Sequence, residues 1–197
     1  MTRVLILFYL SQGHIEKLAE AVAEGARATG AKFDVKRVPE TVPGRGRQKR
    51  ALQARSSAPL ATVTELEHYD AIIVGTGTLW LHVLADGPSS IGPAPSGCAE
   101  RSTARSSGPS HQPPPSMGQE MTLFSIISNL PHFGMIIVGL PYSQGGQMSV
   151  GEIVGGAPYG ATTVAGGDGL REPTETDLAG ERHQGELVAW AAAKLLG

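Results

Sequence analysis

The sequence has little cysteine, no excess of charge of either sign and no long apolar run. Cys98 is the one cysteine among 197 residues, which excludes a disulfide framework within the chain and a metal site built from several thiolates. An apolar stretch of about 18 residues does not occur, so we expect no membrane-spanning helix. The 16 basic and 18 acidic residues nearly balance, which gives no reason to expect a nucleic-acid partner. These absences favour a soluble, cytoplasmic protein.

The residue types that are present are unevenly distributed. With 41% hydrophobic residues the chain has apolar material for one globular domain, 1–197. Within it, residues 79–117 hold half of the 14 prolines among many Ser, Gly and Arg residues, and they predict an irregular or disordered segment. Residues 44–57 are strongly basic and have no hydrophobic period. We expect neither stretch to supply a face of the core.

The rest of the chain alternates between strand and helix patterns. Four segments predict strands, of which all but the second are continuous apolar runs: 4–9, 33–38, 71–74 and 135–138. Apolar residues from Ile15 to Ala26 recur on one helical face, and a second long helix is expected from Thr174 to the C-terminus. Strands that alternate with helices predict a parallel, doubly wound α/β sheet.

The loop after the first strand is the first candidate ligand site, because ligands of doubly wound sheets bind beyond the carboxyl ends of the strands. Here Ser11-Gln12-Gly13-His14 leads into a helix from Ile15. The N–H groups and the positive dipole end at a helix start suit a dianionic phosphate. Gly13 permits close backbone approach, and Ser11 can donate a hydroxyl. The alternative is an ordinary turn capped by Ser11, and the loop by itself leaves both interpretations open.

Several segments at both ends of the chain carry a resemblance to a known family. They are VLILFY, GHIEKLAEAVAEGA, VKRVPETVP, YDAIIVGT, HFGMIIVGLPY, GGAPYGATTVAGGDG and RHQGELVA. Together they resemble the WrbA-type NAD(P)H:quinone oxidoreductases, and GGAPYGATTVAGGDG is the most specific of them. The resemblance implies a flavodoxin-like fold, bound FMN, hydride transfer from NADH or NADPH, two-electron reduction of a quinone, and a homotetramer. It also implies that GGAPYGATTVAGGDG is an ordered loop near the site.

The resemblance assigns flavin-binding roles to seven positions: Ser11, Gln12, Gly13, His14, Ile15, Thr78 and His132. The first five would hold the FMN phosphate. Thr78 would lie near the ribityl chain or the ring, and His132 would approach the flavin from a partner subunit. The alternatives are that the main-chain N–H of His14 matters more than its imidazole and that His132 is an ordinary loop histidine. No residue is assigned as catalytic and none as a metal ligand.

The chain departs from this family in the loops that would surround the flavin. Leu10 and Gln12 stand where the phosphate loop of the family usually has Ser and Tyr. Leu79-Trp80-Leu81 stands where the family has RFG. Three consecutive prolines, Pro113–Pro115, occupy the second flavin loop and remove backbone N–H donors. These departures weaken the expected flavin site.

The fourth strand of the sheet is also in doubt. The family has it within 103–112, where this chain reads TARSSGPSHQ, a polar segment unlike a core strand. We hypothesise that 44–56 and 79–117 are family sequence translated in a wrong reading frame, because permitted codons read one or two nucleotides later restore family-like segments. The alternative is a divergent protein with proline-rich insertions. The nucleotide sequence of the gene decides between them.

Three hypotheses for function follow. The first is an FMN-dependent NAD(P)H:quinone oxidoreductase, with the preferred quinone and the choice between NADH and NADPH left open. The second is a non-catalytic flavodoxin-like protein that binds FMN, which the missing loop Tyr favours slightly. The third is an inactive chain that binds no flavin. The colour of the purified protein and its oxidation of NADH with benzoquinone distinguish the three.

Overall fold

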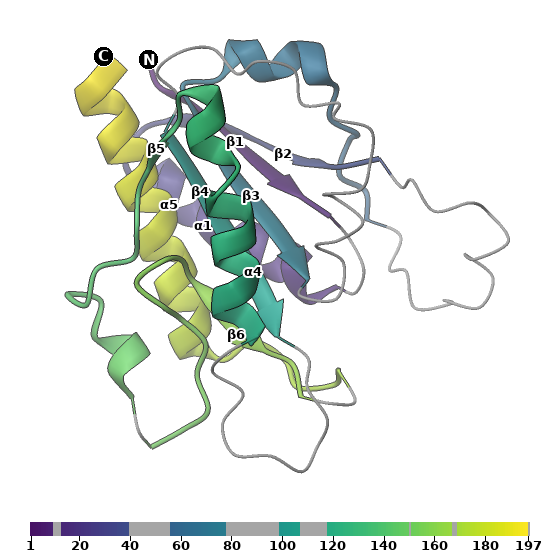
Figure 1. The fold of residues 1–197 in the computed structure, drawn as a ribbon, viewed down its shortest axis with the longest axis vertical. Helices are drawn as coiled ribbons and strands as arrows, with labels where there is room; N and C mark the ends of the chain where they lie inside the picture. Colours follow the sequence, from purple (N-terminus) through teal and green to yellow (C-terminus); the bar gives the residue numbers. More distant parts are fainter. Residues whose placement is uncertain are drawn as a thin grey trace, which may run out of the picture.

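The computed structural model describes residues 1–9, 13–39, 56–77, 99–106, 118–149, 151–166 and 169–196. The strands within them are β1 (Arg3–Phe8), β2 (Lys32–Arg37), β3 (Ala71–Gly77), β4 (Ala99–Ser106), β5 (Ile136–Ile137) and β6 (Thr162–Val164). The helices are α1 (His14–Ala28), α4 (Gly118–Ile127) and α5 (Glu175–Leu196), with the 3-10 helices η1 (Val63–His68), η3 (Leu130–Phe133) and η4 (Gly145–Met148). The strands form a parallel sheet of order β2-β1-β3-β4-β5, in which β6 also pairs with β4 (Figure 1). The prediction of a parallel α/β sheet is confirmed.

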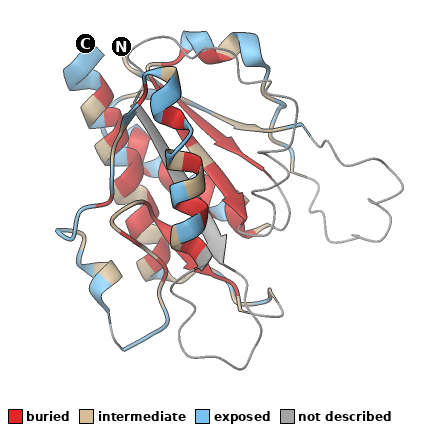
Figure 2. Cartoon of the chain, in the orientation of Figure 1, coloured by how far each residue is buried: buried red, intermediate tan, exposed pale blue. Residues whose placement is uncertain are grey.

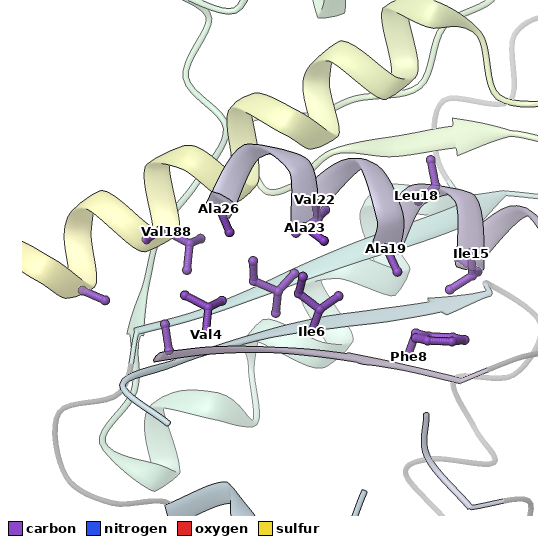
Figure 3. Packing of buried hydrophobic residues seen from close by; sticks show 14 residues of the cluster. Val4, Ile6, Phe8, Ile15, Leu18, Ala19, Val22, Ala23, Ala26 and Val188 are labelled. Carbon is purple, nitrogen blue, oxygen red and sulfur yellow. The ribbon is translucent and has the colours of Figure 1, made fainter. Parts of the chain in front are cut away.

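β1 is buried on both faces because its side chains alternate between two layers. Val4, Ile6 and Phe8 face α1 and α5 (Figure 3). Leu5 and Leu7 pack on the opposite face with residues of η1, α4 and η3. Figure 2 shows buried positions concentrated where helices and sheet meet. The apolar run at 4–9 is therefore a doubly covered strand, as the sequence predicts.

α1 follows the predicted apolar period. Its inward positions are each at most 1% exposed: Ile15, Leu18, Val22 and Ala26. The helix ends at Ala28, and Gly30 then adopts a left-handed conformation with φ of 79°. Glycine is common just past a helix end because it takes this conformation without a steric penalty.

The expectation that no strand of the sheet lies within 103–112 is wrong for residues 103–106, whereas 107–112 lie outside the described residues. β4 occupies Ala99–Ser106 and pairs with β3 from Ala71↔Ala99 to Gly77↔Arg105. On its other side β4 pairs with β5 and β6. A β ladder is made by backbone groups, so a polar segment can complete a sheet between two neighbours that need partners. The other residues of the expected irregular stretch 79–117 lie outside the described residues.

The sheet edge beyond β4 is built from two short strands. β5 pairs with the amino end of β4 at Ala99 and Glu100, whereas β6 pairs with its carboxyl end at Ala104–Ser106. The chain between β5 and β6 therefore leaves this edge and returns to it. β6 lies inside the segment GGAPYGATTVAGGDG that we expected to be a loop, and all its residues are buried. The carboxyl end of β6 brings the residues that follow it to the same end of the sheet as the turn after β1.

An ion pair links β2 to η1. Lys36 Nζ bonds Glu65 Oε2, and the two side chains are 18% and 22% exposed. The hydrogen bond between them raises the pKa of Lys36 and lowers the pKa of Glu65. Glu65 Oε1 also accepts a hydrogen bond from the backbone N–H of Thr62 at 2.6 Å, which caps η1. The pair therefore fastens η1 to the sheet.

We expect Lys36→Met to lower the free energy of unfolding at neutral pH by about 1 kcal/mol. The lowered pKa of Glu65 contributes stability above its ordinary value of 4.5, which is lost as the pH falls through the folded value. The raised pKa of Lys36 contributes stability below 10.5, which is lost as the pH rises through its folded value. The difference between variant and wild type should therefore shrink in acid. Urea denaturation at several pH values measures this difference in the free energy of unfolding, and Lys32→Met, at an exposed lysine, is the control. If Lys36→Met costs as much stability at about pH 3 as at neutral pH, the Lys36–Glu65 ion pair is not the cause.

Candidate functional site

The turn between β1 and α1 lies where the strand order reverses, with β2 on one side of β1 and β3 on the other. This switch point is where open α/β sheets, including flavodoxin-like ones, bind ligands. Gly13 is the N-cap of α1, with φ of −56° and ψ of −10°, and has no side chain with which to cap the first turn. The first N–H groups of a helix have no partner within the helix, so this turn presents donors to an anion.

Two of the predicted phosphate-loop residues have different surroundings. Ile15 is 1% exposed in the core cluster, so its side chain packs and only its backbone N–H can serve a ligand. His14 is 8% exposed, and its Nε2 lies 3.6 Å from Oε2 of Glu172. The imidazole therefore contacts the chain that follows β6. Ser11, Gln12 and Thr78 lie outside the described residues.

Charged side chains surround the first turn of α1. Lys17 Nζ lies 2.9 Å from Glu172 Oε2. Glu16 also belongs to this turn, and its Oε1 accepts a hydrogen bond from Ser56 Oγ at 2.5 Å. An acidic residue here favours the helix but disfavours a bound anion. Lys17, whose side chain is 55% exposed, supplies the opposite charge beside the turn.

His132 does not meet the phosphate turn within one chain. It is exposed and belongs to η3, which precedes β5. β5 pairs with the amino end of β4, whereas Gly13 follows the carboxyl end of β1. In a parallel sheet these are opposite ends. A flavin-binding role for His132 therefore requires that a second subunit bring it to the site.

The structure adds three residues that the sequence reasoning missed. Arg171 and Glu172 follow β6, and Asp177 lies in the first turn of α5. Thr174 N donates to Asp177 Oδ2 at 3.1 Å, and Asp177 N donates to Thr174 Oγ1 at 3.2 Å. This reciprocal pair is a capping box, and its spacing is visible in the sequence. The spacing could have identified Asp177, whereas the partners of Glu172 lie far away in sequence and the partners of Arg171 include backbone carbonyls that no residue pattern marks.

These residues fit the phosphate end of a flavin nucleotide. The turn combines an N-cap without a side chain, first-turn N–H donors and a nearby lysine. Backbone donors at a helix start bind phosphate through hydrogen bonds and the helix dipole together. The acidic side chain of Glu16 is held by Ser56 and does not occupy the N-cap position. The geometry therefore supports an anion at this turn.

Comparisons with known proteins place the chain in a family. No family model matches the sequence. An NAD(P)H dehydrogenase (quinone) from Paraburkholderia phymatum is 54% identical over an alignment of 215 positions that covers 100% of both chains. A protein of the same name from Azorhizobium caulinodans is also 54% identical over 100% of both chains. The chain belongs to the NAD(P)H dehydrogenase (quinone) family. The resemblance seen in the sequence is thereby confirmed.

Solved structures show the fold that this family member adopts. A flavodoxin from the domain Archaea matches with a TM-score of 0.53 and 16% identity, over 96% of this chain and 99% of that chain. An oxidised flavodoxin 2 from Bacillus cereus matches with a TM-score of 0.54 and 12% identity, over 96% of this chain and 99% of that chain. These similarities confirm the flavodoxin-like fold. In the part of the chain that the structure describes, every helix is too short or too polar to cross a membrane.

Proposed function

We propose that this chain is an FMN-dependent NAD(P)H:quinone oxidoreductase that reduces quinones by two electrons. The observation that carries the proposal is the full-length similarity to relatives named NAD(P)H dehydrogenase (quinone). A flavodoxin-like sheet with an anion-binding turn at its switch point supports a flavin cofactor. The chain would act as a single domain, 1–197, in the cytoplasm.

The turn after β1 is the proposed phosphate site. Ser11, Gln12 and Gly13 would hold the FMN phosphate together with the first backbone N–H groups of α1. Ile15 contributes its N–H while its side chain anchors the helix to the core. Thr78 would bind near the ribityl chain or the ring. Holding the phosphate at the end of a rigid helix orients the rest of the cofactor across the carboxyl end of the sheet.

The residues of the chain would bind and orient the cofactor, and the cofactor would supply the redox chemistry. When bound, FMN accepts hydride from NADH or NADPH and passes two electrons to a quinone. Both substrates would use the same pocket in turn, so ping-pong kinetics are expected. The protein supplies phosphate anchoring, ring contacts and exclusion of water.

We further propose a homotetramer, which exposed apolar side chains support. Tyr142, Met148 and Ile153, between β5 and β6, are 61%, 64% and 55% exposed, and Trp190 on α5 is 57% exposed. Large apolar side chains that one chain leaves exposed can be covered by contacts between subunits. Assembly would also let His132 of the partner subunit reach the flavin, which one chain alone does not permit.

A binding and turnover assay tests the proposed function. The protein, made from a gene of verified nucleotide sequence, is incubated with excess FMN, desalted and mixed with NADH or NADPH and benzoquinone. We expect a yellow protein that oxidises the nicotinamide only when the quinone is present. A yellow protein without turnover would favour the non-catalytic FMN-binding alternative, which Gln12 in place of the Tyr of the family's phosphate loop supports slightly. A colourless protein after desalting would refute both.

A further inference from the structure

A buried carboxylate gathers several parts of the chain at the start of α5. The Asp177 side chain is 0% exposed. It accepts hydrogen bonds from Gly155 N at 2.8 Å, Thr163 Oγ1 at 2.7 Å and Thr174 N at 3.1 Å. One side chain thus binds β6, the segment before β6 and the N-terminus of α5. Hydrogen bonds to an ionised acceptor are stronger than neutral ones, so this hub holds its partners closely.

Arg171 is the charged partner of this carboxylate. Its Nη1 donates to Val164 O at 2.5 Å, and its Nη2 donates to Ile153 O. Nη1 also lies 3.6 Å from Asp177 Oδ2. The planar guanidinium therefore binds the carbonyls of Ile153 and Val164, the first and last residues of the segment 153–164. Its positive charge also balances the buried carboxylate.

The backbone on either side of β6 is packed closely against its neighbours. A Cβ added at Gly155 would lie 1.9 Å from Thr162 O, so the backbone before β6 already touches the strand. Ala161 N donates to Gln184 Oε1 of α5 at 2.8 Å, which fixes the entry to β6. The Arg171 backbone N–H donates to Ala165 O at 3.1 Å and closes the loop after the strand. The segments before and after β6 are thus held by close backbone contact and by hydrogen bonds.

The next residue joins this loop to the phosphate turn. Glu172 bonds Lys17 Nζ at 2.9 Å and lies 3.6 Å from His14 Nε2, both in the first turn of α1. The loop after β6 and the turn after β1 leave the same end of the parallel sheet. The sequence separates them widely, but the fold makes them neighbours.

We propose that Arg171 and Asp177 are positioning residues of the flavin site: they hold the described residues that follow β6, 165–166 and 169–172, against the first turn of α1, so that these residues form one wall of the site. The inference deepens the proposed function and rests on it. Neither side chain needs to touch the cofactor, because both act through the backbone of the loop. Removing Asp177 leaves the buried donors at Gly155 and Thr163 without this acceptor, and removing Arg171 takes the positive charge from the buried carboxylate; either change frees the wall to move.

Hydrogen exchange of the wild-type chain, with and without FMN, tests whether this loop is a wall. We expect FMN to slow exchange in peptides that cover 165–172 as well as in peptides that cover the start of α1. Protection confined to the start of α1 would overturn the inference while leaving the proposed function intact. Wild-type protein that binds no FMN would overturn the proposed function itself.

Substitution tests the positioning role. We expect Arg171→Met to weaken FMN binding by about tenfold or more in a fluorescence titration, and to remove the protection of 165–172. Arg182→Met is the matched control, because Arg182 also bonds two partners, Glu24 and Glu175, but none in the loop. The control should change FMN affinity by less than about twofold. Equal losses of FMN affinity in the two variants, or an unchanged affinity in Arg171→Met, would overturn the inference. Asp177→Asn, which keeps the side-chain volume, should weaken FMN binding as Arg171→Met does.

Discussion

Gly13→Asp is expected to weaken FMN binding strongly while making the cofactor-free protein slightly more stable. The φ of −56° at Gly13 is open to any residue, so the substitution introduces no backbone strain. A carboxylate at the N-cap accepts the N–H groups of the first turn and stabilises the helix by a few tenths of a kcal/mol to about 1 kcal/mol. The same carboxylate occupies the donors that a phosphate needs and repels its charge. We expect the dissociation constant of FMN to rise by about a hundredfold or more.

The opposite signs of these two effects make the test specific. Fluorescence titration measures FMN affinity, and thermal unfolding without FMN measures stability. Gly13→Asn is the matched control, because it caps the helix without adding charge, and its affinity should fall between those of wild type and Gly13→Asp. Unchanged affinity in Gly13→Asp would mean that the phosphate binds elsewhere. Loss of affinity together with loss of stability would mean only that the turn had been damaged.

Gly185→Ala is expected to separate α1 from α5 and to cost about 3 kcal/mol or more of unfolding free energy. A Cβ at Gly185 would lie 2.1 Å from Val22 O and 3.1 Å from Ala26 N, which are backbone atoms of α1. Backbone atoms of a helix cannot turn aside as a side chain can, so the helices must move apart. Gly25 makes the reciprocal approach, with its Cβ position 1.8 Å from Arg182 O. Alanine has the better helix propensity by about 1 kcal/mol, which is too little to compensate.

Another glycine of the same helix provides the control for this substitution. A Cβ at Gly180 would meet its nearest atoms, Ala161 Cβ and Leu140 Cδ2, at 3.9 Å, an ordinary van der Waals contact. Gly180→Ala should therefore raise stability by up to about 1 kcal/mol through helix propensity. Urea denaturation of both variants measures the contrast. Similar stability of the two variants would contradict the close approach of α1 and α5.

Much of the fold was predictable because its signals are local. The run at 4–9 and the period of α1 depend only on neighbouring side chains, and both predictions are confirmed. The strand expected at 135–138 is present as the shorter β5, Ile136–Ile137. The helix expected from Thr174 begins at Glu175. β1 and α1 bury apolar side chains in a repeating pattern that the sequence shows, whereas Ile136 of β5 is 49% exposed.

The candidate site was predictable only in part. The phosphate turn follows from a strand, a glycine and a helix start in succession, and the structure describes Gly13 and His14 there. The sequence could not show that Glu172 contacts this turn, because that contact depends on how two distant loops leave one end of the sheet. The separation of His132 from the turn likewise became visible only from the pairing of β5 with the amino end of β4.

The sequence by itself determined the doubly wound class, the covered central strand and the family, because apolar period and residue identity are properties of short segments. The tertiary structure alone decided that a polar segment completes the sheet as β4 and that three residues of a glycine-rich loop become β6. It also decided that Asp177 and Arg171 bind the chain around β6. The reason is that backbone hydrogen bonds and buried charges gain their strength from partners brought close by folding, and a linear pattern does not record those partners.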